Sequence, residues 1–165
     1  MTDLERLVAK EEITDQLYTY ARGLDRIDPE LGKACFDPNA DVDYGPIFKG
    51  KGPGFIDDML NQHRGMIATH HVVTNILIKF SEDGTRAASE CYLYAACRFT
   101  DEMTVIARCR DMDNWVKREG KWVTVKRIVA GDNSFMLIPA GFTDSYNSDR
   151  DNKNDPSYEM FKFVE

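Results

Sequence analysis

The chain has 165 residues, 42% of them apolar, which is enough to bury the core of one domain. Its net charge of −7 and sequence pI near 5.0 give no electrostatic reason to expect nucleic acid or an anionic membrane surface as a partner. No apolar run approaches the roughly 18 residues of a membrane span, and the start lacks the basic and apolar regions of a signal peptide, so we expect a cytoplasmic protein.

The first half of the sequence is expected to be mainly helical. Apolar residues recur at helical spacing up to Leu24, and Leu4, Leu7 and Val8 begin this stripe. Asp28 is the expected N-cap of a short second helix that ends near residue 35, because Pro29 suits the first helical position. A turn at 37–39, short strands at 40–44 and 47–49, and a third helix at about 55–66 complete this half.

The second half is expected to be sheet, with strands at 69–80, 86–99, 103–118 and 121–130. The turns between them, at 82–85 and 119–120, carry Asp-Gly and Glu-Gly pairs that are typical of hairpins. Helices followed by a meander of long strands predict an α+β fold. We expect a cone-like α+β barrel, in which about three helices pack on the concave side of a strongly curved, mixed or antiparallel sheet.

The predicted domain covers residues 1–140. Residues 141–165 are polar and rich in turn formers, but they end in Tyr158, Met160, Phe161 and Phe163. These apolar side chains predict a tail that docks on the body of the domain or on a neighbouring subunit.

A pair of residues far apart in sequence suggests acid–base chemistry. His71 stands at the head of a predicted strand and Asp25 at the end of a predicted helix. Imidazole accepts a proton near neutral pH, and a nearby carboxylate would raise its basicity and fix its tautomer. A negative charge at a helix C-terminus is opposed by the helix dipole, so Asp25 requires a cationic or hydrogen-bonding partner. Arg22 and Arg26 are the alternative partners to a histidine.

Only one of the adjacent residues His70 and His71 can face the concave side of a regular strand. Ile76, Ile78 and Phe80 share their phase with His70, which favours His70. A bulge between the two segments would instead turn His71 inward. His63, on a polar stretch of the third helix, is expected to be solvated.

The sequence offers no obvious site for a metal or a cofactor, and we expect neither. The four cysteines form no C-x-x-C pair, and those at 91, 97 and 109 fall in strands, where free cysteine behaves as a small buried hydrophobe. The glycine-rich run at 50–54 lacks the spacing of a phosphate loop.

Three segments resemble the SnoaL-like branch of the nuclear transport factor 2-like superfamily: residues 13–25, His70–Asn75 and residues 115–125. The likeness spans roughly residues 3 to 135, in the same order of elements. The branch includes scytalone dehydratase, hexachlorocyclohexane dehydrochlorinase and a bile-acid 7α-dehydratase. The superfamily also holds isomerases, cyclases, hydrolases and binding modules, so the fold is better specified than the reaction.

The resemblance implies that Asp25 and His71 form a base dyad. It also implies a catalytic role for Tyr20, five residues before Asp25, and substrate binding by Tyr44. The eliminating members carry an arginine late in the last strand, where this chain reads Val-Ala-Gly-Asp-Asn at 129–133 and Arg127 lies out of register.

These observations predict a cofactor-independent lyase that performs a dehydratase-type elimination. The expected substrate is a hydrophobic cyclic or polycyclic small molecule, and the expected assembly is a homo-oligomer, either a trimer or a dimer. Two alternatives stay open: an isomerase or cyclase that acts by proton transfer in the same pocket, and a non-catalytic module that binds a small ligand.

Overall fold

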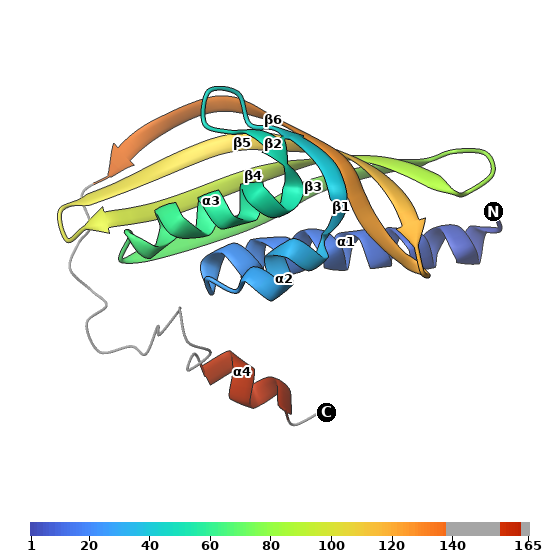
Figure 1. Ribbon diagram of the computed structural model, residues 1–165, viewed down its shortest axis with the longest axis horizontal. Coiled ribbons are helices and arrows are strands. Elements are labelled where there is room, and N and C mark those ends of the chain that lie inside the picture. Colours follow the sequence, from blue (N-terminus) through green and yellow to red (C-terminus); the bar gives the residue numbers. More distant parts are fainter. Residues whose placement is uncertain (138–155, 163–165) are drawn as a thin grey trace.

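A six-stranded curved sheet covers three helices in the computed structural model, which describes residues 1–137 and 156–162 (Figure 1). The elements are α1 (Asp3–Asp25), α2 (Pro29–Ala34), β1 (Phe36–Asp43), β2 (Lys49–Lys51), α3 (Gly52–Arg64), β3 (Ala68–Phe80), β4 (Arg86–Thr100), β5 (Met103–Arg118), β6 (Lys121–Leu137) and α4 (Pro156–Phe161). The strand order is β2-β1-β6-β5-β4-β3, and every pair is antiparallel except β1 with β6. The expected α+β cone is confirmed.

Local signals in the sequence set both ends of α1. Thr2 and Glu5 form a capping box at the start. At the other end the backbone N–H of Asp28 donates to the carbonyl of Gly23 (2.8 Å) and that of Ile27 to Leu24 (3.3 Å), the paired bonds of a Schellman motif. Ile27 takes the left-handed position of this motif with φ +51°, which is costly for a β-branched residue. The chain thus turns sharply just after Asp25.

The turn brings α2 against α1 with almost no space between the two backbones. A Cβ atom on Gly23 would lie 2.7 Å from the backbone nitrogen of Gly32, so only glycine fits there. Asp28 caps α2 by accepting bonds from the N–H groups of Glu30 and Leu31, as the Asp-Pro pair predicted.

Bulges in two strands decide which side chains face the helices. In β3, Thr74 pairs with Tyr92 and Leu77 with Glu90, so β3 carries one extra residue there, and Asn75 has φ +50°. In β6, Lys126 pairs with Asn114 and Thr124 with Trp115, which leaves Val125 without a partner. Each bulge shifts the alternation of its strand by one residue.

The core lies between the sheet and the helices in two clusters. One joins the end of α1 and α3 to β1, and its members are Tyr20, Leu24, Ile27, Cys35, Phe36, Ala40, Val42, Phe55, Ile56, Met59 and Leu60. The other joins the middle of α1 to β4, β5 and β6 through Ala9, Ile13, Leu17, Ala87, Cys91, Trp115 and Trp122. Asp25 and β3 lie along the edge of this core.

Several sequence-based boundaries were wrong. The predicted turn at 37–39 lies inside β1, where Asp37 accepts a bond from the N–H of Asn39 and the register with β6 shifts. The second short strand falls at 49–51, α3 begins at Gly52, and β6 continues to Leu137.

The burial of two groups also differs from expectation. Leu4, Leu7 and Val8 are exposed, and Leu4 and Val8 line an open hollow between the start of α1 and the turn at Asp83 and Gly84. His63 is buried rather than solvated. Most of the predicted tail, residues 141–155 and 163–165, lies outside the described residues. In α4, the hydroxyl of Tyr158 donates to Asp28 (2.7 Å), and Arg22 donates to Ser157 (3.0 Å).

Candidate active site

Asp25 lies where the end of α1 meets the free edge of β3. Because β3 is the last strand of the sheet, alternate backbone N–H groups on its outer edge have no neighbouring strand. The N–H of His71 is one of these, and it donates to Oδ2 of Asp25 (2.9 Å). The carboxylate therefore replaces a missing strand at this point.

The side chain of His71 approaches the same carboxylate. Nδ1 lies 2.6 Å from Oδ1 of Asp25, and the hydroxyl of Thr69 donates to that oxygen at 2.9 Å. The two side chains are 6% and 12% exposed, so the contact is largely shielded from water. Nε2 of His71 has no hydrogen-bond partner within the described part of the chain. An imidazole with Nδ1 bonded to a carboxylate and Nε2 unpaired is arranged as a general base.

The pKa of Asp25 is shifted by opposing effects. Burial raises it, but the hydrogen bonds and charge of His71 and the hydroxyl of Thr69 act against burial and hold the pKa below its ordinary value. Asp25 is therefore ionised at neutral pH, as an orienting carboxylate must be.

The other two histidines differ in their relation to the dyad. His70 is exposed and lies on the opposite face of β3, since the bulge at Asn75 turns Thr69, His71 and Val73 toward the helices. The bulge predicted from the conflicting phases is thus confirmed. His63, from the last turn of α3, stacks on the ring of His71 with centroids 5.4 Å apart and planes 28° apart.

A buried charge cluster occupies the inner face further along the sheet. Arg127 is 1% exposed and donates two bonds to Asp113, from Nε (2.7 Å) and Nη2 (2.8 Å). Its Nη1 lies 3.3 Å from Oδ2 of Asp111 without the geometry of a hydrogen bond, so this buried N–H group is unsatisfied by the described residues. Burial lowers the pKa of Arg127, but the two carboxylates outweigh burial and hold it well above its ordinary value. Burial raises the pKa of Asp111 despite the nearby guanidinium.

The two candidate tyrosines lie beside this cluster rather than in contact with the dyad. The guanidinium of Arg127 lies over the ring of Tyr20, 4.1 Å from the centroid, and Tyr44 packs edge-on against Phe55. Neither tyrosine makes a hydrogen bond or ring contact with Asp25 or His71. Burial raises the pKa of both hydroxyls, so both remain neutral hydrogen-bond donors.

The SnoaL-like domain family matches residues 5–128. The chain belongs to this family. A search of curated proteins found no match.

Solved structures with the SnoaL-like fold cover most of the chain. A candidate scytalone dehydratase from Novosphingobium aromaticivorans is 24% identical with a TM-score of 0.74, and the match covers 87% of this chain and 100% of that one. A type 2 hexachlorocyclohexane dehydrochlorinase is 17% identical (TM-score 0.75; 88% and 100% covered). A type 3 dehydrochlorinase from Novosphingobium barchaimii is also 17% identical (TM-score 0.73; 88% and 100% covered). At these identities the likeness establishes the fold.

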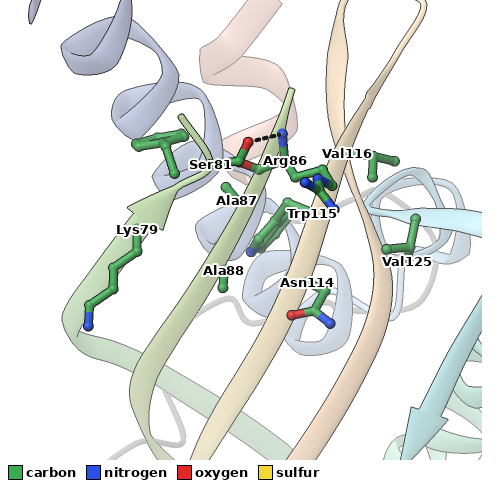
Figure 2. A pocket seen from close by; sticks show the side chains of 10 residues that line it. Lys79, Ser81, Arg86, Ala87, Ala88, Asn114, Trp115, Val116 and Val125 are labelled. Carbon is green, nitrogen blue, oxygen red and sulfur yellow. Dashed lines mark hydrogen bonds between the residues drawn. The ribbon is translucent and has the colours of Figure 1, made fainter. Parts of the chain in front are cut away.

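A cleft of about 470 Å³ opens beside the dyad of this SnoaL-like domain, and its lining includes Asp25, His71, His70, Arg22 and Arg26. A second hollow, of about 450 Å³, lies at the other end of the long strands (Figure 2). Trp115 lies in this second hollow, between the labelled residues of β4 and β6. Since about 25–30 Å of extended strand separates Phe80 from His71, the two openings are independent. The lining of the second contains no histidine, carboxylate, tyrosine or cysteine, whereas that of the first contains Asp25, His70 and His71.

Sequence reasoning missed two parts of this site. The polar neighbours of His63 in the sequence predict a solvent-exposed side chain, but its position in the last turn of α3 directs it toward the end of α1. Arg127 faces inward because the bulge at Val125 reverses the phase of β6, and since Val123 and Val125 are both apolar, the alternation of the strand does not predict this.

Two further findings concern the described residues as a whole. No group of three or more His, Cys, Asp or Glu side chains among them is placed to hold a metal ion. None of their helices combines the length and apolar character needed to cross a membrane.

Proposed function

We propose that this protein is a cofactor-independent lyase that removes water or another small leaving group from a hydrophobic cyclic or polycyclic molecule. The observation that carries the proposal is the 2.6 Å contact between Asp25 and Nδ1 of His71 beside an open cleft. The dehydratase and dehydrochlorinase names of the structural neighbours support elimination as the reaction class.

In the proposed reaction, Nε2 of His71 takes a proton from a carbon made acidic by a neighbouring carbonyl or leaving group. Asp25 orients the imidazole and stabilises its cationic form. General-base catalysis of this kind raises the reaction rate by about 10²–10⁴-fold. His71 is preferred to His70 as the base because only His71 contacts Asp25.

The departing or polarised oxygen requires a donor, and three candidates lie in or against the core between the sheet and the helices. Tyr20 and Tyr44 carry neutral hydroxyls, and Nη1 of Arg127 is a buried cationic N–H group that receives no hydrogen-bond partner from the described residues. Preorganised donors of this kind stabilise developing negative charge in a site shielded from water. The residues next to His71 across the sheet are Ala95 on β4 and then Ala107 on β5, both with small side chains.

The test is a substrate screen run in heavy water. Hydroxylated polycyclic ketones and steroids are incubated with the protein, and products are identified by mass spectrometry. A lyase gives a product lighter by one molecule of water. An isomerase gives a rearranged product with the molecular formula of the substrate, carrying deuterium only where the abstracted proton exchanges with solvent before it is returned. Binding without turnover or exchange across the panel would support the ligand-binding alternative instead.

The same proposal includes a homo-oligomer. The face of the sheet opposite the helices exposes large apolar side chains, among them Tyr92, Tyr94 and Leu77. Apolar patches of this kind on a soluble protein are commonly covered by another copy of the chain.

A further inference from the structure

His63 is a buried titratable group that the proposed reaction does not use. It is 5% exposed and lies in the last turn of α3, eight residues before His71 in the sequence. Its Nδ1 lies 3.4 Å from the carbonyl oxygen of Leu24. Because a carbonyl can only accept, Nδ1 carries the proton in this contact. His63 therefore bonds to the residue that directly precedes Asp25 and stacks on the residue that Asp25 orients.

The imidazole of His71 needs more than Asp25 to fix its orientation. Rotation about the bond between Cβ and the ring has broad, roughly two-fold preferences, so the torsion itself does not select one ring plane. The described residues give the ring one hydrogen bond, at Nδ1, and leave Nε2 unpaired. The face of the ring is held by the 5.4 Å stack on His63.

We propose that His63 is a positioning residue of the dyad. Its ring holds the imidazole of His71 in the plane in which Nδ1 meets Asp25, and its bond to Leu24 ties α3 to the end of α1 that carries the carboxylate. The catalytic consequence rests on the proposed function, but the positioning itself is a property of the protein without substrate.

The test uses NMR of the full-length protein labelled with nitrogen-15. A short hydrogen bond to a buried carboxylate gives the Nδ1 proton of His71 a far-downfield resonance that exchanges slowly with water. Its loss in Asp25→Asn and in His71→Gln assigns the signal. Three substitutions of His63 then separate stacking from hydrogen bonding: His63→Phe keeps an aromatic face, His63→Gln keeps a donor, and His63→Leu keeps neither.

We expect the resonance to persist in His63→Phe and to broaden or disappear in His63→Gln and His63→Leu, with circular dichroism unchanged. With a substrate in hand, kcat should fall about tenfold in His63→Gln with little change in KM, and stay within about twofold in His63→Phe. An unaltered resonance in His63→Gln, or its loss in His63→Phe with the fold intact, would overturn the proposal. If His63→Leu does not fold, the Phe and Gln variants decide the matter alone.

The two proposals can fail separately. The resonance reports on the ring of His71 whether or not any substrate is turned over, so an empty substrate screen leaves the positioning role intact. Conversely, an unaffected resonance removes His63 from the account and leaves the dyad of Asp25 and His71 unchanged.

Discussion

Asp25 has a structural role in the fold and, in the proposed reaction, a chemical role as well. It accepts the backbone N–H and the Nδ1 group of His71 together with the hydroxyl of Thr69. These bonds offset the unfavourable position of a negative charge at a helix C-terminus, which costs a few tenths to about 1 kcal/mol. The same bonds that stabilise the edge of β3 therefore hold the dyad together.

Asp25→Asn should lower the free energy of unfolding in a pH-dependent way. The folded protein holds the pKa of Asp25 below its ordinary value, so the ionised carboxylate stabilises the fold above that value, and the stabilisation is lost as the pH falls through the lowered pKa. We expect a loss of about 1–3 kcal/mol at neutral pH that shrinks below about pH 4. Urea denaturation of both proteins over a pH series measures this difference. A difference that stays constant from neutral to acidic pH would contradict the assignment.

The two carboxylates around Arg127 should respond differently to neutralisation. Asp113→Asn breaks a buried two-bond ion pair and should cost about 3–5 kcal/mol of unfolding free energy. Burial raises the pKa of Asp111, so its ionised form weakens the fold as the pH rises, and Asp111→Asn removes that cost. Asp111→Asn should change stability by less than about 1 kcal/mol at neutral pH, or increase it. Equal losses in the two variants would show that Asp111 is an equal partner of Arg127.

At the level of elements, the bulge in β3 was predictable from the sequence, whereas the bulge in β6 was not. His71 and the segment from Ile76 to Phe80 could not share a face without a bulge, so the bulge at Asn75 was predictable. Around Val125, apolar residues occupy both the inward and the outward positions of β6. Which of them face the helices is therefore set by the pairing of β6 with β5, and the local sequence pattern does not encode this pairing.

Helix ends with strong caps were predicted well, and ends set by tertiary contacts were not. Asp28 with Pro29 marked the start of α2. By contrast, α3 begins at Gly52 with no side-chain cap, and a Cβ at Gly52 would lie 2.8 Å from the ring of Phe36. The start of α3 is thus fixed by packing on β1, which a local pattern does not show.

Gly23→Ala should test the contact between α1 and α2 that places Asp25. The added Cβ would lie 2.7 Å from the backbone of Gly32, and a backbone neighbour cannot move aside cheaply. We expect a loss of about 1–3 kcal/mol in thermal or chemical unfolding. Gly54→Ala is the matched control, since its Cβ meets only Phe48 at 3.9 Å and alanine favours a helix by up to about 1 kcal/mol. Equal effects of the two substitutions would remove the close contact as an explanation.

At the scale of the whole molecule, the outer face of the sheet is not covered by any of the helices α1, α2 and α3 (Figure 1). Val72 pairs with Tyr94 and Thr74 with Tyr92, which places both tyrosines on one face, and Tyr92 lies opposite Arg110 on β5. Arg110 is within ion-pair distance of Glu90 and Asp132. Apolar and paired charged groups side by side are typical of an interface between like subunits.

Replacing Tyr92 and Tyr94 together by lysine should dissociate the proposed homo-oligomer. The new charges would lie beside Arg108 and Arg110, and burying them against a second copy would be strongly unfavourable. Light scattering after size-exclusion chromatography should show a dimer or trimer for the native protein and a monomer for the variant. Ile47→Lys, on an exposed residue between β1 and β2, should leave the mass unchanged. A monomeric native protein, or an unchanged mass in the double variant, would contradict the proposed interface.

The whole fold was predictable because helices followed by long hairpins leave few arrangements, and the family resemblance selected the cone. The reaction was less predictable for a physical reason. The same dyad can deliver a proton to solvent, with loss of a leaving group, or return it to another carbon, and that choice depends on the substrate rather than on Asp25 and His71.

The most direct test of the dyad is the rate of proton abstraction in His71→Gln compared with His70→Gln, measured as kcat/KM on the first substrate found by the screen. We expect a loss of about 10²–10⁴-fold for His71→Gln and a change within about threefold for His70→Gln. A native rate in His71→Gln, or a large loss confined to His70→Gln, would contradict it.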